Sequence, residues 1–246
     1  MPAVLTTDEF DARVIGAGRA GGSLAGALRA AGWSVEGPLG RDVDRSVATT
    51  GARVVVLAVP DGDVAEVASS LRPGEAVVVH LAGSLGLDAL APHPRVASVH
   101  PLVSLPDPEL GAERLRGAWF AVAGDEHTTG ELVGALDGRS VAVADEDRVR
   151  YHAGAAIAAN HLVALLGQVE RIADSIGVPL EAYLDLARGA LDNVAAVGAH
   201  DALTGPVARG DWATVARHLE ALPEDERTSY SVLADAARRL SEQVPA

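Results

Sequence analysis

Three glycines near the N-terminus stand in the pattern Gly-x-Gly-x-x-Gly. Gly16, Gly18 and Gly21 follow a short apolar run, 12–15, and precede a helical pattern, 24–31. In a strand-turn-helix unit the first glycine permits the tight turn, the second lets the backbone approach a pyrophosphate, and the third lets the helix pack close to the strand. The free N–H groups at the helix N-terminus attract phosphate. The pattern therefore predicts a dinucleotide site, rather than a glycine-rich turn without a ligand.

The residues about 20 positions beyond this motif bear on which dinucleotide binds. An enzyme that uses NAD usually has an acidic residue there for the ribose 2′-hydroxyl, whereas this chain has Gly40-Arg41-Asp42. Arg41 suits a 2′-phosphate and favours NADP over NAD. In the competing interpretation Asp42 or Glu36 holds the hydroxyl, and Arg41 is a solvated surface residue.

Further cofactor contacts are expected at two neighbouring places. Arg19 and Ala20 open the helix whose N-terminus would face the phosphates. Val59, Pro60 and Asp61 end a second strand at the carboxyl edge of the sheet, where ligands lie in this kind of fold. Asp61 has a structural alternative, which we favour: it can cap the helix that follows.

Histidine is the natural proton source near neutral pH for a hydride transfer to a carbonyl or imine. His80 and His100 each end a predicted strand, and His152 lies on a predicted helix. We assign catalytic roles to His100 and His152, and also to Asn160 in the second half of the chain. His100-Pro101 can instead be a restricted turn, His152 can be a half-exposed helix residue, and His80 can be structural.

Three polar residues in the second half of the chain are candidates on the substrate side. Asn160 stands in an Ala-rich helix, where its amide can bind a carboxamide or a substrate oxygen, or serve packing. Thr204 and Arg209 belong to a loop with a Gly-Pro turn. Arg209 can clamp a substrate carboxylate or pair internally with Asp211.

Composition narrows the classes of function. The net charge of −14 disfavours nucleic acid and anionic membranes as partners and favours a small molecule. The sequence contains no cysteine and no lysine, so thiolate, zinc-thiolate, iron–sulfur and lysine chemistry are excluded, and no metal site is expected. No signal segment and no long apolar run are visible, and we therefore expect a cytoplasmic location.

The sequence predicts alternating strands and helices in the first part of the chain and helices alone in the rest. Helical or turn segments separate seven Val- and Ala-rich runs, which predicts a Rossmann-type α/β domain with a mostly parallel sheet over residues 1–144. Residues 145–246 are predicted to form an all-helical domain for substrate binding and dimerisation, starting at a cap residue, Asp145. The stretch 100–117 is expected to be a long loop. The strand runs are 12–15, 33–36, 53–59, 76–81, 95–99, 119–123 and 140–143, and the later helices are 146–176, 180–197, 212–222 and 224–243.

Several short motifs together resemble a family of Rossmann-like oxidoreductases whose helical C-terminal half is a domain of unknown function. They are the glycine motif, Val59-Pro60-Asp61, His80-Leu81-Ala82-Gly83, Val99-His100-Pro101-Leu102, Tyr151-His152-Ala153 with Asn160, and 203–211. The family is similar to ketopantoate reductase, pyrroline-5-carboxylate reductase and 6-phosphogluconate dehydrogenase. The resemblance covers nearly the whole chain and implies a dinucleotide domain, a helical domain that dimerises, and a substrate held between them.

One departure from these relatives limits what the resemblance implies. In ketopantoate reductase and the 3-hydroxyacid dehydrogenases a lysine on the first helix of the second domain polarises the carbonyl, one turn before an asparagine. Asn160 matches that asparagine, but Ala156 stands where the lysine is expected. The function expected is therefore an NADP-dependent oxidoreductase that transfers a hydride to or from a small carbonyl or imine. The alternative is a catalytically silent dinucleotide-binding sensor or scaffold.

Overall fold

The computed structural model describes residues 9–243 and contains two compact units, which divide between Ala159 and Asn160. Unit 1 alternates strands with helices, as the sequence predicts. Its elements are β1 (Phe10–Ile15), α1 (Arg19–Ala30), β2 (Val35–Leu39), β3 (Ala52–Leu57), η1 (Asp61–Asp63), α2 (Val64–Ser70), β4 (Val77–His80), η2 (Leu87–Leu90), β5 (Val96–Pro101), α3 (Pro108–Leu115), β6 (Trp119–Gly124), α4 (Glu126–Ala135), β7 (Arg139–Ala142), η3 (Asp145–Asp147) and α5 (Arg148–Ala156).

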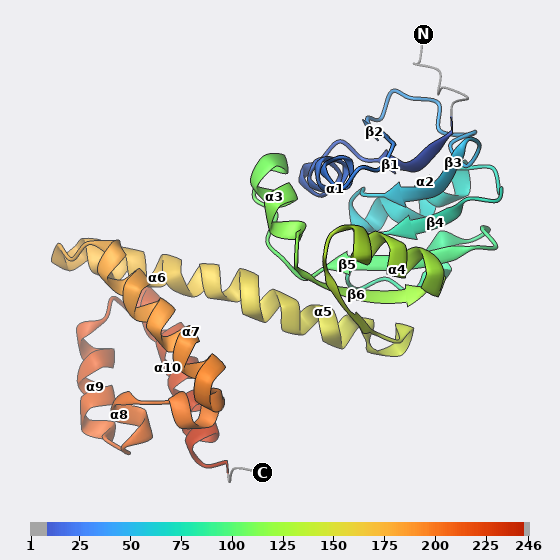
Figure 1. Cartoon of the computed structure of the whole chain (residues 1–246). Helices are drawn as coiled ribbons and strands as arrows, with labels where there is room; N and C mark the ends of the chain where they lie inside the picture. Colours follow the sequence, from blue (N-terminus) through green and yellow to red (C-terminus); the bar gives the residue numbers. More distant parts are fainter. Residues whose placement is uncertain (1–8, 244–246) are drawn as a thin grey trace. The chain divides into compact units, whose positions relative to one another are not determined.

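The strands of unit 1 form one sheet of seven strands in the order β2-β1-β3-β4-β5-β6-β7 (Figure 1). Neighbouring strands run parallel except β5 and β6, which pair antiparallel. The chain passes from β1 to β2 on one side and then crosses to β3 on the other. This reversal between β1 and β3 is the topological switch point at which doubly wound sheets bind ligands.

Two apolar clusters cover the two faces of this sheet, because the central strands are continuous runs of Val and Ala that must be buried on both sides. On one face α1, α3 and α4 contribute Leu24, Leu28, Leu115 and Leu132. The helices α1 and α3 lie side by side there (Figure 1). On the other face α2 and η2 cover Val55, Leu57 and Val78. The predicted fold class, a Rossmann-type α/β domain followed by helices, is confirmed.

Unit 2 is entirely helical within its described residues. Gly177, with φ 70°, ends α6 in the left-handed region that favours glycine, as the sequence predicts. Gly198, with φ 80°, breaks the regular geometry inside α7. The helices are α6 (Leu162–Ile176), α7 (Leu180–Ala202), α8 (Gly205–Ala208), α9 (Trp212–Ala221) and α10 (Glu224–Ser241).

Two sequence-based expectations about local structure were wrong. The stretch 100–117 is not one loop, since α3 lies within it. Asp107 caps α3 by accepting from the N–H of Leu110, and Pro108 occupies the first turn. The expected helix 146–176 is interrupted by a π-helical turn, η4 (Ile157–His161).

The two compact units divide within η4, so that α5 belongs to unit 1. The functional boundary expected at 144/145 stays a prediction. Among the described residues, no helix has the length and apolar character needed to cross a bilayer.

Candidate functional site

Two of the three glycines in the turn between β1 and α1 could not carry a side chain unless the neighbouring backbone moved. Gly16 has φ 115°, and a Cβ atom there would lie 2.2 Å from the carbonyl oxygen of Ala58. A Cβ at Gly21 would lie 1.9 Å from the carbonyl oxygen of Gly16. Gly18 differs, because a Cβ there would meet nothing within 4 Å. The first and third glycines thus permit the packing of α1 on the sheet, while the second faces open space.

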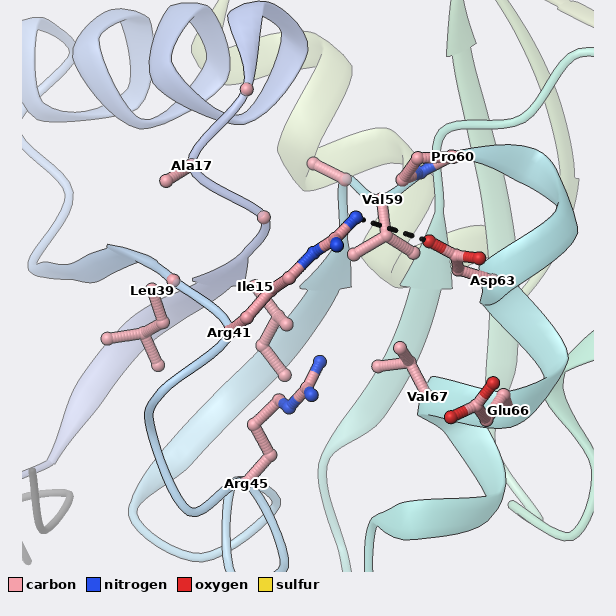
Figure 2. Close-up of a pocket in the computed structure, with 14 residues that line it drawn as sticks. Ile15, Ala17, Leu39, Arg41, Arg45, Val59, Pro60, Asp63, Glu66 and Val67 are labelled. Atoms are coloured by element: carbon pink, nitrogen blue, oxygen red, sulfur yellow. Dashed lines mark ion pairs between the residues drawn. The ribbon is translucent and has the colours of Figure 1, made fainter. Parts of the chain in front are cut away.

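That open space belongs to a pocket of about 630 Å³ at the switch point between β1 and β3. Figure 2 shows the turn after β1, the loop after β2 and the start of α2 around it. A pocket of this volume falls within the range of small-molecule and cofactor sites. Its lining residues are Ile15, Gly16, Ala17, Gly18, Leu39, Gly40, Arg41, Arg45, Ala58, Val59, Pro60, Asp63, Glu66 and Val67.

Two arginines from the loop after β2 supply cationic side chains to the pocket lining. Arg41 is 87% exposed and stands 3.9 Å from the carboxylate of Asp63, a loose ion pair across the pocket (Figure 2). Arg45 also lines the pocket, and Figure 2 shows its guanidinium pointing from the loop after β2 toward the middle of the pocket. Because an ion pair this exposed contributes little to stability, Arg41 can leave Asp63 at small cost.

The acidic residue that would bind a ribose hydroxyl is engaged elsewhere. Glu36 forms an ion pair with Arg13, whose side chain is fully buried. Arg13 also donates to the carbonyl oxygen of Thr50 at 2.7 Å. Neither Glu36 nor Asp42 is among the lining residues of the pocket.

The remaining predicted cofactor residues divide into two groups. Val59 and Pro60 line the pocket, whereas Arg19 and Ala20 begin α1 beside it without lining it.

The favoured structural role of Asp61 was wrong: its side chain does not cap a helix. Instead it accepts a hydrogen bond from the Ser84 hydroxyl at 3.3 Å.

A second group of polar side chains gathers in unit 1 near the ends of β4 and β5. His100, on β5, places Nδ1 2.7 Å from the hydroxyl oxygen of Tyr151 on α5. The His100 ring also meets the ring of His152 edge to face, with 5.7 Å between centroids. A Cβ at Gly83 would lie 2.9 Å from Nε2 of His100 and 2.5 Å from Cδ2 of His152, so both rings pack against this glycine. The structure therefore brings His100 and His152 together.

Beside these rings lie three buried residues with unsatisfied polar atoms. The Arg148 side chain is fully buried and stands 3.4 Å from Asp145, but Nη1 and Nη2 have no hydrogen-bond partner among the described residues. Nδ1 of His80 and Oγ of Ser98, on paired positions of β4 and β5, are likewise unpartnered. Asp145 accepts from the N–H of Leu87 at 3.0 Å and caps no helix, contrary to expectation.

Burial dominates the protonation of these groups. It lowers the pKa of His100 to about 4, helped by the neighbouring imidazole of His152, so His100 is neutral at pH 7. Burial also lowers the pKa of His80. For Tyr151, burial raises the pKa of the phenol above 10.0, against the opposing effect of the Arg148 charge.

The substrate-side candidates lie in unit 2, and each is exposed. Asn160 stands in the π-helical turn η4, a feature often found at functional sites. Thr204 precedes α8 without capping it, and Arg209 follows α8. Asp211 caps α9 by accepting from the N–H and hydroxyl of Thr214. Arg209 makes no direct ion pair with Asp211, although its charge helps to lower the pKa of that carboxyl.

Sequence reasoning assigned no role to Tyr151, Arg148 or Arg45. Tyr151 had a usable signal, since it directly precedes His152 on one helix. The burial of Arg148 and the reach of Arg45 into the pocket depend on tertiary packing and carry no local signal. Among the described residues there is no group of three or more His, Asp or Glu side chains that could hold a metal ion.

Comparison with known protein families adds one match. Residues 118–237, from β6 to near the end of α10, match the model of DUF2520, a domain of unknown function. The match and the fold confirm the resemblance expected from the sequence, to Rossmann-like oxidoreductases with a helical C-terminal domain of unknown function. No curated protein sequence matches the chain.

Solved structures with the same fold span nearly the whole chain. A Bacteroides fragilis protein, provisionally described as an NADP oxidoreductase, is 18% identical, with a TM-score of 0.76 over 95% of this chain and 100% of its own. A Thermotoga maritima protein is 25% identical, with a TM-score of 0.69 over 94% and 98%. Plasmodium falciparum pyrroline carboxylate reductase, solved with NADP bound, is 12% identical, with a TM-score of 0.62 over 96% and 99%.

Proposed function

We propose that this chain is an NADP-dependent oxidoreductase that transfers a hydride to or from a small carbonyl or imine compound. The observation that carries the proposal is the pocket at the switch point between β1 and β3, where Gly18 leaves room for a diphosphate. The N-terminus of α1 begins there and offers free N–H groups with partial positive charge. The residues present therefore fit a dinucleotide.

The choice of NADP over NAD rests on the charges that follow β2. Arg41 and Arg45 line the pocket, while Glu36 pairs with buried Arg13. A 2′-phosphate can bind two guanidinium groups through charge-assisted hydrogen bonds. A ribose 2′-hydroxyl would need an acceptor, and the acids that line the pocket, Asp63 and Glu66, belong to η1 and α2 rather than to the loop after β2.

The chemistry proposed is consistent with proteins of the same fold. The pyrroline carboxylate reductase carries NADP, and an imine reductase from Aspergillus terreus was solved with NADPH4 and dibenz[c,e]azepine. Both names describe reductases of carbon–nitrogen double bonds. We therefore propose a reductase whose substrate class includes imines as well as carbonyl compounds. When bound, NADPH would supply the hydride, while the chain binds the substrate, orients it and supplies the proton.

This proposal includes the catalytic assignments of His100, His152 and Asn160. It also includes the assignment of substrate binding to Thr204 and Arg209. The contact between the rings of His100 and His152 supports a shared role for these two histidines. A substrate position between the two domains stays a prediction.

A dinucleotide-binding protein without turnover is the second candidate, and the absence of lysine favours it. The two candidates are separated by NADPH consumption, followed at 340 nm across a panel of keto acids and cyclic imines. We expect turnover with at least one compound and a lower rate with NADH. Tight NADPH binding without turnover of any compound would favour the silent protein.

We also propose that unit 2 forms a homodimer. Few residues of unit 2 are buried, and α7 has no buried residue at all. Large apolar side chains are exposed along it, among them Leu186 (70%), Leu191 (55%) and Val197 (55%). An exposed apolar surface of this kind on one helix is typical of an association surface.

A further inference from the structure

Reduction of a carbonyl or imine requires a proton donor as well as a hydride, and the chain has neither lysine nor cysteine to supply one. We propose that Tyr151 is this donor and that His100 returns the proton to it. The inference rests on the function proposed above, which left the proton donor open.

The geometry of the pair is that of a proton relay. The hydroxyl oxygen of Tyr151 and Nδ1 of His100 are 2.7 Å apart, a short hydrogen bond between α5 and β5. The rings meet edge to face, with centroids 5.5 Å apart, which fixes the direction of the phenol. Both side chains are half-buried, so a substrate can approach the hydroxyl.

His100 is suited to return a proton because its ring is neutral, with one nitrogen that donates a hydrogen bond and one that accepts. In the tautomer that carries hydrogen on Nδ1, His100 donates to the Tyr151 oxygen and leaves the phenol O–H free for a substrate. Nε2 then has a lone pair and lies beside Gly83, a residue that has no side chain to cover it. A proton from water can reach this nitrogen without charging the ring permanently.

Arg148 supports the anionic form of Tyr151 once the proton has left. Arg148 begins the same helix three positions before Tyr151, and its side chain is fully buried. All three of its guanidinium nitrogens lack a hydrogen-bond partner among the described residues. The positive charge acts to lower the pKa of Tyr151, although burial raises it more. Arg148 is thus a positioning residue that stabilises the phenolate.

When bound, NADPH would supply the hydride for the new C–H bond at the substrate carbon and would leave as NADP⁺. The Tyr151 O–H bond breaks as the substrate oxygen or nitrogen takes its proton. Nδ1 of His100 gives its proton to the phenolate oxygen while Nε2 takes one from a water molecule, and the hydroxide left behind is neutralised by a proton from the solvent. His100 stays neutral throughout, and exchange of its ring protons with solvent restores the tautomer with hydrogen on Nδ1.

A second Tyr–His pair in the chain provides a matched control. The hydroxyl oxygen of Tyr230 also lies 2.7 Å from Nδ1 of a histidine, His218, with ring centroids 5.9 Å apart. This pair joins α9 and α10, and no buried arginine accompanies it among the described residues. A general effect of removing a Tyr–His hydrogen bond would therefore appear in both Tyr151→Phe and Tyr230→Phe.

The experiment compares the wild type, Tyr151→Phe and Tyr230→Phe for NADPH affinity and for turnover. We expect Tyr151→Phe to bind NADPH as the wild type does and to lose about 100-fold or more in kcat, with KM little changed. The alkaline limb of the kcat profile, above pH 10 in the wild type, should be absent from the variant. Tyr230→Phe should match the wild type.

A measurement without substrate completes the test. Nitrogen-15 shifts of His100 in the wild-type protein, assigned with His100→Gln, should show hydrogen on Nδ1. Hydrogen on Nε2, or an unchanged kcat in Tyr151→Phe, would overturn the inference and leave the proposed function standing. Wild-type protein that binds no NADPH would instead refute the proposed function, and this inference with it.

Discussion

At the scale of single residues, the pocket depends on which charges are already engaged. Arg13 is fully buried and takes Glu36 as its partner, so the loop after β2 presents Arg41 and Arg45 rather than an acid. The sequence indicated Arg41 but left Glu36 open, because pairing over 23 positions cannot be deduced from spacing. Spacing in the sequence likewise could not show that Arg148 is buried, because its burial arises from the packing of α5 within unit 1.

Replacement of Arg41 tests the preference for NADP. Arg41→Ala should weaken NADPH binding about tenfold or more and leave NADH binding nearly unchanged, because only NADPH has the 2′-phosphate. Fluorescence titration of both cofactors measures this. Arg116→Ala, which removes another exposed arginine paired with an aspartate at 3.5 Å, is the control. Equal losses for the two cofactors would contradict the assignment.

The low pKa of His100 predicts a pH dependence of stability. The folded protein holds His100 neutral down to about pH 4, whereas the unfolded chain protonates it near 6.5. The stability of the folded protein is therefore unaffected by this group above about pH 6.5 and falls by about 3 kcal/mol as pH is lowered to about 4. Urea unfolding at pH 7 and pH 4.5 should show a smaller difference for His100→Gln than for the wild type. An equal difference would mean that His100 titrates normally.

At the scale of elements, the strands were predictable and the interruptions of helices were not. All seven strand runs appear in the structure. The signal is strongest for the central parallel strands β3 and β4, which are buried and rich in Val. The helix α3 was missed although Asp107-Pro108 is a helix-start pattern, since the Pro-rich context outweighed it. The π-helical turn η4 has no sequence signal that we could have used.

The turn between β1 and α1 allows a matched comparison of two glycines. Gly21→Ala should destabilise the protein by about 1–3 kcal/mol, because its Cβ would lie 1.9 Å from a backbone oxygen and α1 must move away from the sheet. Gly18→Ala meets nothing within 4 Å and should change stability by only a few tenths of a kcal/mol. Urea titration measures both. Equal stability of the two variants would show that α1 does not pack as described.

At the scale of the whole molecule, the two units differ in how much apolar surface they bury. The clusters on the two faces of the sheet give unit 1 its own core. In unit 2, few apolar residues are buried among those that the structure describes, and Ala173 and Val215 are the buried apolar residues of its helices. The sequence predicted the helices of unit 2, but periodicity alone cannot show which partner covers an apolar face.

A homodimer through unit 2 makes the oligomeric state sensitive to α7. Leu186→Arg should convert a dimer to monomers in sedimentation equilibrium, since it places a charge on an apolar surface. Leu110→Arg, on an exposed position of α3 in unit 1, should leave the dimer intact. A wild-type protein that is monomeric at micromolar concentration would contradict the proposal.

The central claim is that the pocket beside Gly18 holds the diphosphate of NADP, and calorimetric titration of NADPH tests it most directly. The wild type should bind NADPH with a measurable heat. Gly18→Asp should fold normally, because its side chain enters open space, yet bind at least 100-fold more weakly, because the carboxylate occupies and repels the diphosphate position. Gly130→Asp, in open space on α4, should bind as the wild type does. Unchanged affinity in Gly18→Asp, or no heat with the wild type, would contradict the account.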